Sequence, residues 1–247
     1  MCPGLAVLRS RRNRLNPISA SRVRCGRLVL QARPAPTLRS VLVKLSVLAL
    51  GLAAGLAFAA PASAQGAATR DPAQIPAGTY VVDPGHTQAM FTVNHFGFSP
   101  YTGIFSDVAG TLDLQPTKPA DSRLKITIPV KSLYAPSQHL VDSLKSDKWL
   151  DATQFPEMTF TSTKVTPEGK DKAKVVGDLT LHGVTKPVTL EVTLVGAGAN
   201  PMNKKQTVGF EAKGTLKRSD FGVKTFVPAV SDEVQLTLHG AFERKDQ

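Results

Sequence analysis

The amino-acid sequence predicts an all-β fold: a barrel or sandwich of antiparallel strands, interrupted by one short helical insert. Three observations lead to this prediction. Apolar and polar residues alternate with a period of two in many segments, turn-forming residues separate these segments, and only one segment has a helical pattern. A strand with one apolar and one polar face is typical of antiparallel sheet. Many such strands joined by turns indicate a barrel or two packed sheets.

The first 64 residues have the pattern of a secretory signal peptide. They contain nine Arg residues and Lys44 but no Asp or Glu, and an apolar run of 16 residues separates Lys44 from Pro61. The small residues Ala62-Ser63-Ala64 come next, as expected at a cleavage site. We therefore expect cleavage after Ala64 and export to the periplasm. The apolar run is shorter than the ~20 residues of a spanning helix, which disfavours an uncleaved membrane anchor.

Two alternatives for this leader stay open. Arg11-Arg12 is compatible with a twin-arginine signal, although the apolar run begins far downstream, at Leu45. The stretch before Lys44 is also long for a signal peptide. Translation that begins near Val41 is therefore an alternative to translation from Met1.

The positive charge and the cysteines of the chain belong to the leader. The full chain of 247 residues has 30 basic and 19 acidic side chains, a net charge of +11. Without residues 1–64, 20 basic and 19 acidic side chains remain, and no nucleic-acid-binding surface is indicated. Both cysteines, Cys2 and Cys25, lie in the leader, which excludes disulfides and Cys-bound metals from the mature chain.

After the leader, residues 65–78 are small, polar and rich in Pro and Gly, and we expect a flexible arm there. A single barrel domain follows, over residues 79–245. Within it Leu140, Val141 and Leu144 share one face, which predicts a helical insert near 138–150. The predicted strands fall within 79–82, 88–95, 102–114, 123–130, 158–162, 174–181, 188–194, 207–216 and 234–243.

Several motifs follow one another along residues 79–243. The longest, GDLTLHGVTKPVTL, runs from Gly177 to Leu190. The others are YVVD from Tyr80, FTVNHFG from Phe91, GIF from Gly103, GTL from Gly110, FPEMTFTS from Phe155, RSDFG from Arg218 and DEVQL from Asp232. In these motifs the chain resembles the YceI-like, polyisoprenoid-binding family of bacterial periplasmic proteins. The resemblance implies an extended, lipocalin-like antiparallel β-barrel of about eight strands, whose long interior holds an isoprenoid or similar lipid.

The inward-facing, mostly apolar side chains are the candidate ligand-binding residues. Alternation alone predicts that they fill the core, as in most barrels of about eight strands. The resemblance implies instead that they line a lipid cavity. Trp149 suits either the mouth of the barrel or the packing of the insert. The candidates are Phe91, Val93, His95, Phe105, Ile126, Ile128, Leu144, Trp149, Met158, Phe160, Phe210, Phe221 and Phe226.

Histidine is the one candidate residue type for catalysis or metal binding. His182 and His239 are expected to point outward, whereas His95 shares the apolar face of its strand. A single His on such a face is most often a core group that is hydrogen-bonded to the backbone; contact with the polar end of a ligand is the alternative. The sequence has no metal-ligand spacing, nucleophile elbow or phosphate-binding loop. We therefore expect no cofactor, no metal and no catalytic residue.

These observations predict a soluble periplasmic protein that carries or scavenges an isoprenoid or other long-chain lipid, with a homodimer left open. An outer-membrane barrel would need apolar outward faces. The outward faces here carry charged residues, namely Lys125, Glu191, Lys213 and Glu243. An enzyme that acts on a bound lipid is the remaining alternative, with His95 as its candidate centre.

Overall fold

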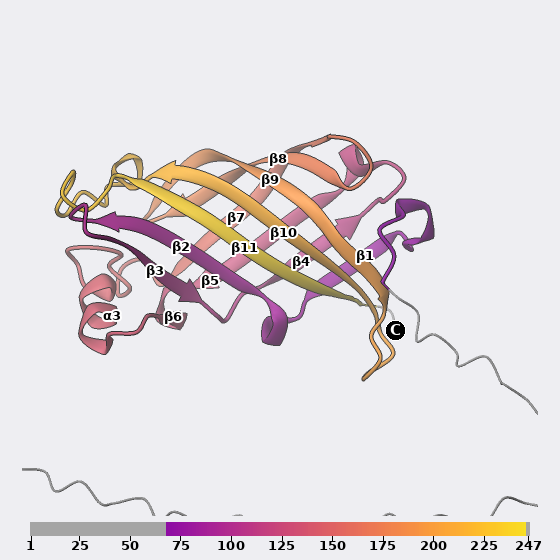
Figure 1. Ribbon diagram of the computed structural model, residues 1–247, viewed down its shortest axis with the longest axis horizontal. Coiled ribbons are helices and arrows are strands. Elements are labelled where there is room, and N and C mark those ends of the chain that lie inside the picture. Colours follow the sequence, from indigo (N-terminus) through magenta and orange to yellow (C-terminus); the bar gives the residue numbers. More distant parts are fainter. Residues whose placement is uncertain (1–67, 246–247) are drawn as a thin grey trace, which may run out of the picture. The chain divides into compact units, whose positions relative to one another are not determined.

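Eight antiparallel strands close into a barrel in the computed structural model, which describes residues 68–245 (Figure 1). Strand β11 pairs with β1 and so closes the ring, with Val82 opposite Phe242 and Tyr80 opposite Arg244. In spatial order the ring consists of β1 (Gly78–Val82), β4 (Ala109–Leu114), β5 (Arg123–Pro129), β7 (Glu157–Pro167), β8 (Lys172–Leu181), β9 (Val184–Ala199), β10 (Gln206–Lys217) and β11 (Glu233–Arg244). The predicted antiparallel β-barrel is confirmed.

Three further strands extend the barrel at one end. They are β2 (Gln88–His95), β3 (Ser99–Phe105) and the two-residue β6 (Leu133–Tyr134). Strand β11 carries both groups: its residues 235–239 pair with β2, and its residues 242–244 pair with β1. The chain passes from β1 to β2 through the 3-10 turn η2 (Pro84–His86), where Asp83 Oδ1 accepts a hydrogen bond from Gly85 N at 3.0 Å. Strands β1 and β2 thus lie one after the other along the same side of β11.

The sequence segment 102–114, predicted as one run, contains two strands. Ser106 and Asp107, which favour turns, separate β3 from β4. Because β3 pairs with β2 and β4 pairs with β1, the break moves the chain from the extension into the ring. Strand β6 was not predicted, since two residues are too short to show alternation. The remaining 3-10 turns are η1 (Pro72–Gln74), η3 (Pro119–Asp121), η4 (Val130–Ser132) and η5 (Arg218–Phe221).

The predicted helical insert is the helix α3 (Gln138–Lys145). It begins after Ser137, whose side-chain oxygen accepts a hydrogen bond from Leu140 N. It ends at Lys145, earlier than the predicted boundary at 150, and residues 146–150 form turns instead. The side chains of Val141 and Leu144 are buried, and Leu140 packs on the core. The expected apolar face of the helix is therefore turned towards the barrel.

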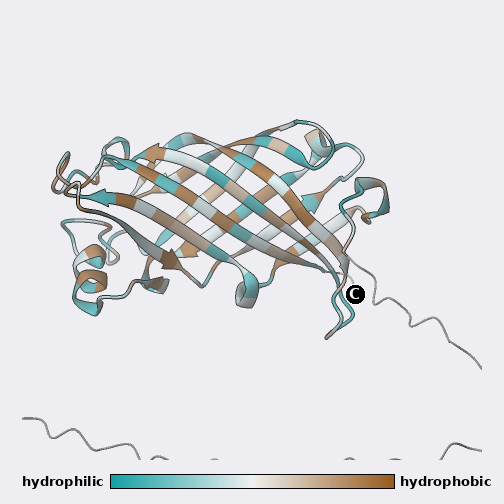
Figure 2. Cartoon of the chain, in the orientation of Figure 1, coloured by the Kyte–Doolittle hydropathy of each residue, from teal (hydrophilic) through white to brown (hydrophobic). Residues whose placement is uncertain are grey.

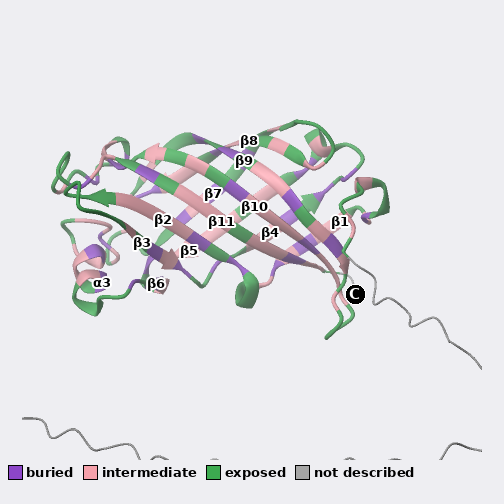
Figure 3. Ribbon diagram, viewed as in Figure 1, coloured by how far each residue is buried: buried purple, intermediate pink, exposed green. Residues whose placement is uncertain are grey.

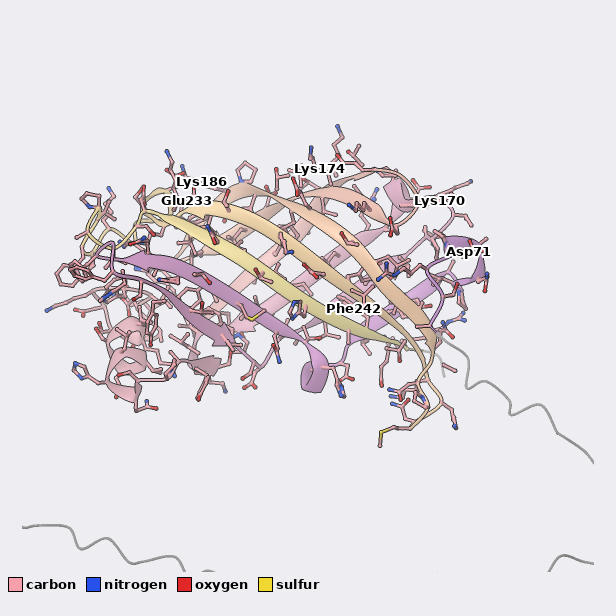
Figure 4. The ribbon with its side chains drawn as sticks, in the orientation of Figure 1. Asp71, Lys170, Lys174, Lys186, Glu233 and Phe242 are labelled. Atoms are coloured by element: carbon pink, nitrogen blue, oxygen red, sulfur yellow. The ribbon has the colours of Figure 1, made fainter. Side chains whose placement is uncertain are left out.

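Alternation along the strands separates an apolar interior from a polar exterior. Hydrophobic and hydrophilic residues alternate along the ribbons in Figure 2, and buried and exposed residues alternate in Figure 3. Tyr80 and Val208 are completely buried. The outward positions carry charges, including the ion pair between Lys213 Nζ and Glu211 Oε1 at 2.6 Å. Figure 4 shows Lys174 and Lys186 on the outer side of β8 and β9.

The segment expected to be a flexible arm follows the barrel wall from residue 68 onwards. Thr69 and Ala197 exchange two backbone hydrogen bonds of 2.8 Å, and Arg70 Nε donates to the carbonyl of Val195. Ile75 is buried, and Pro76 accepts a hydrogen bond from the Tyr80 hydroxyl at 2.7 Å. These contacts give residues 68–78 a defined course. The predicted leader, its cleavage site and residues 65–67 lie outside the described residues.

Candidate functional site

The barrel encloses two adjacent cavities. The larger has a volume of about 330 Å³ and the smaller about 200 Å³. Six residues line both of them and form their common wall: Ala89, Leu124, Ile126, Ile128, Leu190 and Leu238. The two cavities together form an apolar space inside the sheet. The volume of the larger cavity is within the range of small-molecule binding sites, about 300–1,000 Å³.

Most candidate residues meet in the larger cavity. Eleven of the thirteen line it: Phe91, Val93, His95, Phe105, Ile126, Ile128, Leu144, Trp149, Met158, Phe160 and Phe226. Phe210 lines the smaller cavity. Phe221 lines neither; its side chain is 2% exposed in the core. This difference arises because Phe221 belongs to η5 and not to a strand, so strand alternation does not determine its direction.

Glycines on neighbouring strands make room for two of the aromatic rings. Gly103 lies opposite Phe91 in the β2–β3 pair, and a Cβ atom at Gly103 would collide with that ring. Gly177 on β8 likewise leaves space for the ring of Phe160 on β7. The Phe91 ring also contacts the Phe105 ring, with centroids 5.8 Å apart. The glycines therefore allow large side chains to lie along the wall.

Aromatic rings surround one end of the larger cavity, which we call the mouth. Phe226 joins two of them, with ring centroids 6.4 Å from Phe96 and 6.3 Å from Trp149. His95 contacts Phe96 at 4.5 Å and Tyr101 at 6.5 Å. All five residues line the cavity. Figure 1 shows the β2 terminus, α3 and the loop between β10 and β11 at this end of the barrel.

His95 is at the mouth and is exposed. It is therefore not the buried, hydrogen-bonded core group that its alternation position predicts. The physical reason is its place at the end of β2, where the inward side opens onto the mouth. His182 also differs from an outward solvated residue: it is half-buried, its Nδ1 lies 3.1 Å from the carbonyl oxygen of Phe221, and its ring contacts Phe155.

Arg218, which the sequence did not identify, holds the loop 222–231 at the mouth. Its side chain is 5% exposed. Its guanidinium donates three hydrogen bonds to backbone carbonyls of this loop: Nε to Ser231 at 2.9 Å, Nη1 to Val223 at 2.9 Å and Nη2 to Val230 at 2.8 Å. Burial lowers the pKa of Arg218, and the charge of Asp232 partly opposes this shift. The sequence placed Arg218 in the RSDFG motif but gave it no role at the site, because a basic side chain is normally assigned to the surface.

Polar side chains are few in the lining of the larger cavity. They are His95, Tyr101, Ser143, Trp149 and Arg218, and the other lining residues are apolar. The Tyr101 hydroxyl is buried and has no hydrogen-bond partner within residues 68–245. The polar groups are concentrated towards the mouth, since most of them belong to the residues around it. The arrangement suits a ligand with a long apolar body and at most a small polar end.

The described residues contain no cluster of three or more His, Cys, Asp or Glu side chains placed to hold a metal ion. Among the helices of the same residues, none is long and apolar enough to cross a membrane.

Comparisons with known proteins agree with the fold. The chain is 38% identical to protein YceI of Shigella flexneri over 186 residues, which cover 74% of this chain and 93% of that protein. The structure of BcnA from Burkholderia cenocepacia superposes with a TM-score of 0.59 at 29% identity, covering 65% of this chain and 98% of BcnA. A polyisoprenoid-binding domain from Saccharophagus degradans has the same fold, with a TM-score of 0.53 at 13% identity, covering 68% and 99%.

The YceI-like domain family matches residues 80–242, which include every strand of the barrel in whole or in part. The chain belongs to the YceI-like domain family.

Proposed function

We propose that this protein binds a long-chain lipid, a polyisoprenoid or a fatty-acid-like molecule, with the apolar chain inside the barrel. The observation that carries this proposal is the lining surface of the two adjacent cavities, which is almost entirely apolar. Charged or strongly polar ligands would lose their hydration there without gaining hydrogen bonds. A hydrocarbon chain makes no hydrogen bonds with water and therefore has no such loss on entering the cavities.

The energetics favour a long ligand over a short one. Transfer of each methylene from water to an apolar site contributes about 0.8 kcal/mol. Affinity is therefore expected to rise with chain length until the chain reaches the end of the second cavity, near Phe210 and Phe242. The Saccharophagus degradans domain, which has the same fold and is described as polyisoprenoid-binding, supports this ligand class.

The first 64 residues support a periplasmic location for lipid binding. The basic flank, the apolar run and the small residues before Gln65 are the features of an export signal. The exported protein would act in the periplasm as a carrier or scavenger of lipid. Its charged outward positions, such as Lys125 and Glu191, suit a protein that is soluble in water.

A binding role suits the mouth better than catalysis by His95. A catalytic imidazole is usually oriented by a hydrogen-bonded partner. The described contacts of the His95 ring are with the aromatic rings of Phe96 and Tyr101. These contacts suit an apolar ligand passing the mouth.

The proposal can be tested through Trp149, which is the only tryptophan of the chain and lines the cavity. Purified protein would be titrated with a series of isoprenoid alcohols and fatty acids of increasing length, and the fluorescence of Trp149 recorded. We expect saturable changes whose dissociation constant decreases as the chain lengthens. An absent response to every long-chain lipid, or equal affinity for short and long chains, would contradict the proposal.

A further inference from the structure

The mouth carries an exposed apolar patch formed by Phe96, Phe98, Phe226 and Val227. Phe98 is 89% exposed and Phe226 is 63% exposed, while Phe96 and Val227 are 44% and 36% exposed. They belong to the turn after β2 and to the loop between β10 and β11, which Figure 1 shows at the same end of the barrel. Water contact at such large side chains is unfavourable. A patch of this kind marks a site of interaction.

The patch continues into the cavity. Phe96 and Phe226 are exposed on the surface and also line the larger cavity. Their ring centroids are 6.4 Å apart, and Phe226 lies 6.3 Å from Trp149 further along the wall. An apolar molecule can therefore follow hydrocarbon and aromatic surface from the outside of the protein to its interior.

The backbone at Phe96 and Phe226 has an unfavourable conformation. Phe96 and Phe226 have φ angles of 56° and 58°, in the left-handed region that bulky residues rarely adopt. Hydrogen bonds hold both positions: Phe96 N donates to Ala229 at 2.9 Å, and the Phe226 carbonyl accepts from Val230 N at 2.8 Å. Asn94 and Ser231 join the same two segments through a further backbone hydrogen bond of 2.9 Å. Backbone strain retained in this way is typical of functional sites.

The charges of the two segments that carry the patch suit a lipid surface. Neither segment 94–101 nor segment 222–231 contains Asp or Glu, and Lys224 is their only Lys or Arg. Aromatic side chains accompanied by Lys or Arg are typical of protein segments at the interface of a bilayer. A long-chain lipid also resides in a bilayer before it is bound, because its free concentration in water is very low.

We propose that the mouth docks on the surface of a lipid bilayer, with Phe98, Phe226 and Val227 inserted among the lipid head groups. The lipid then passes along Phe96 and Phe226 into the cavity without crossing water. This inference rests on the proposed function, since it gives the route by which the bound lipid enters and leaves.

The test is a flotation assay with vesicles of phosphatidylcholine, with and without phosphatidylglycerol. Phe98→Ser is the informative variant, because Phe98 is exposed and does not line either cavity. Met202→Ser is its matched control: Met202 is 90% exposed, and it lies in the turn between β9 and β10, at the opposite end of β10 from the loop 222–231. Phe98→Trp retains an aromatic side chain at the same position.

We expect the wild type, Met202→Ser and Phe98→Trp to float with the vesicles. Phe98→Ser should associate with the vesicles at least about tenfold more weakly, because it loses one phenyl group buried in the bilayer. Equal association of Phe98→Ser and the wild type, or no association of the wild type, would overturn the docking proposal. So would a wild-type dimer that Phe98→Ser dissociates while vesicle association is unaffected.

Lipid retention, measured by extraction of the same samples with organic solvent, separates the two proposals. Retained lipid without vesicle association would contradict the docking proposal but not the proposed function. Absence of lipid and of lipid uptake in the wild type contradicts the proposed function.

Discussion

The guanidinium of Arg218 lies over the ring of Trp149, with 5.3 Å between Cζ and the ring centroid. The same guanidinium binds three backbone carbonyls of the loop 222–231, as described above. One buried cation thus contacts both the loop and the tryptophan at the mouth. The relationship couples the stability of this region to the shape of the site.

Arg218→Lys tests this coupling. A lysine has a single ammonium centre and cannot reach three carbonyls in the directions of a guanidinium. Carbonyls left unpaired in a buried position cost about 1–3 kcal/mol each. We expect the free energy of unfolding, measured with urea, to fall by about 3 kcal/mol and the Trp149 emission to shift. An unchanged unfolding midpoint would show that the three hydrogen bonds do not stabilise the loop.

Gly103→Ala should overfill the cavity wall. The new Cβ would occupy space held by the Phe91 ring, so that either the ring or the β2–β3 pair must move. Overpacking of this kind costs about 1–3 kcal/mol. Phe91→Leu in the same chain should restore much of the lost stability, because the smaller side chain frees that space. Additive effects of the two changes in urea unfolding would contradict the contact.

Tyr101→Phe removes a buried hydroxyl that has no hydrogen-bond partner among the described residues. An unpaired buried hydroxyl is unfavourable, so the variant should gain about 1 kcal/mol in the free energy of unfolding. Lipid affinity should stay the same if only the apolar chain is held. A tenfold weaker affinity would instead assign the hydroxyl to the polar end of the lipid.

Asp232 should make stability depend on pH in the acid range. Burial raises the pKa of Asp232, but two hydrogen bonds from Ser219 and the charges of Arg218 and Lys217 outweigh this and lower the pKa below its ordinary value of 3.8. Ser219 N and Oγ donate at 2.9 Å and 2.7 Å. Since the folded state favours the carboxylate, the stabilisation is present above about pH 4 and is lost as the pH falls below that value.

Asp232→Asn should therefore be less stable than the wild type at neutral pH, by less than about 1 kcal/mol because solvent screens this group. The difference should disappear in strong acid, and Ser219→Ala should give an intermediate effect. Urea unfolding at several pH values measures both. A difference that persists at the lowest pH would show that the charge of Asp232 is not its cause.

Alternation predicted the inward faces well because strand side chains point to opposite sides in turn. Phe91, Ile126 and Phe160 all reach the cavity for this reason. Positions outside regular strands escaped the rule: Phe221 and Arg218 both lie in the 3-10 turn η5, and Arg218 is a basic residue turned inward. His95 follows the alternation, but it is exposed because it is the last residue of β2, at the mouth.

The sequence alone also could not show that the barrel contains free space. The same side chains that line a cavity fill a core in other barrels, and the difference depends on the sheet's dimensions and on long-range packing. The pairing of Thr69 with Ala197 likewise joins segments far apart in the sequence. Small and polar residues near the start of the barrel therefore predicted flexibility where the structure has contacts.

The most direct test of lipid binding is native mass spectrometry of the protein, as purified and after incubation with a long polyprenol. Leu238 belongs to the common wall of the two cavities, and its neighbour Thr237 points to the other side of β11. We expect the wild type and the control Thr237→Phe to carry one long-chain lipid, and Leu238→Phe to lose it because the added ring obstructs the space. Wild-type protein that shows only the polypeptide mass, or Leu238→Phe that retains the lipid fully, would contradict a lipid chain inside the barrel.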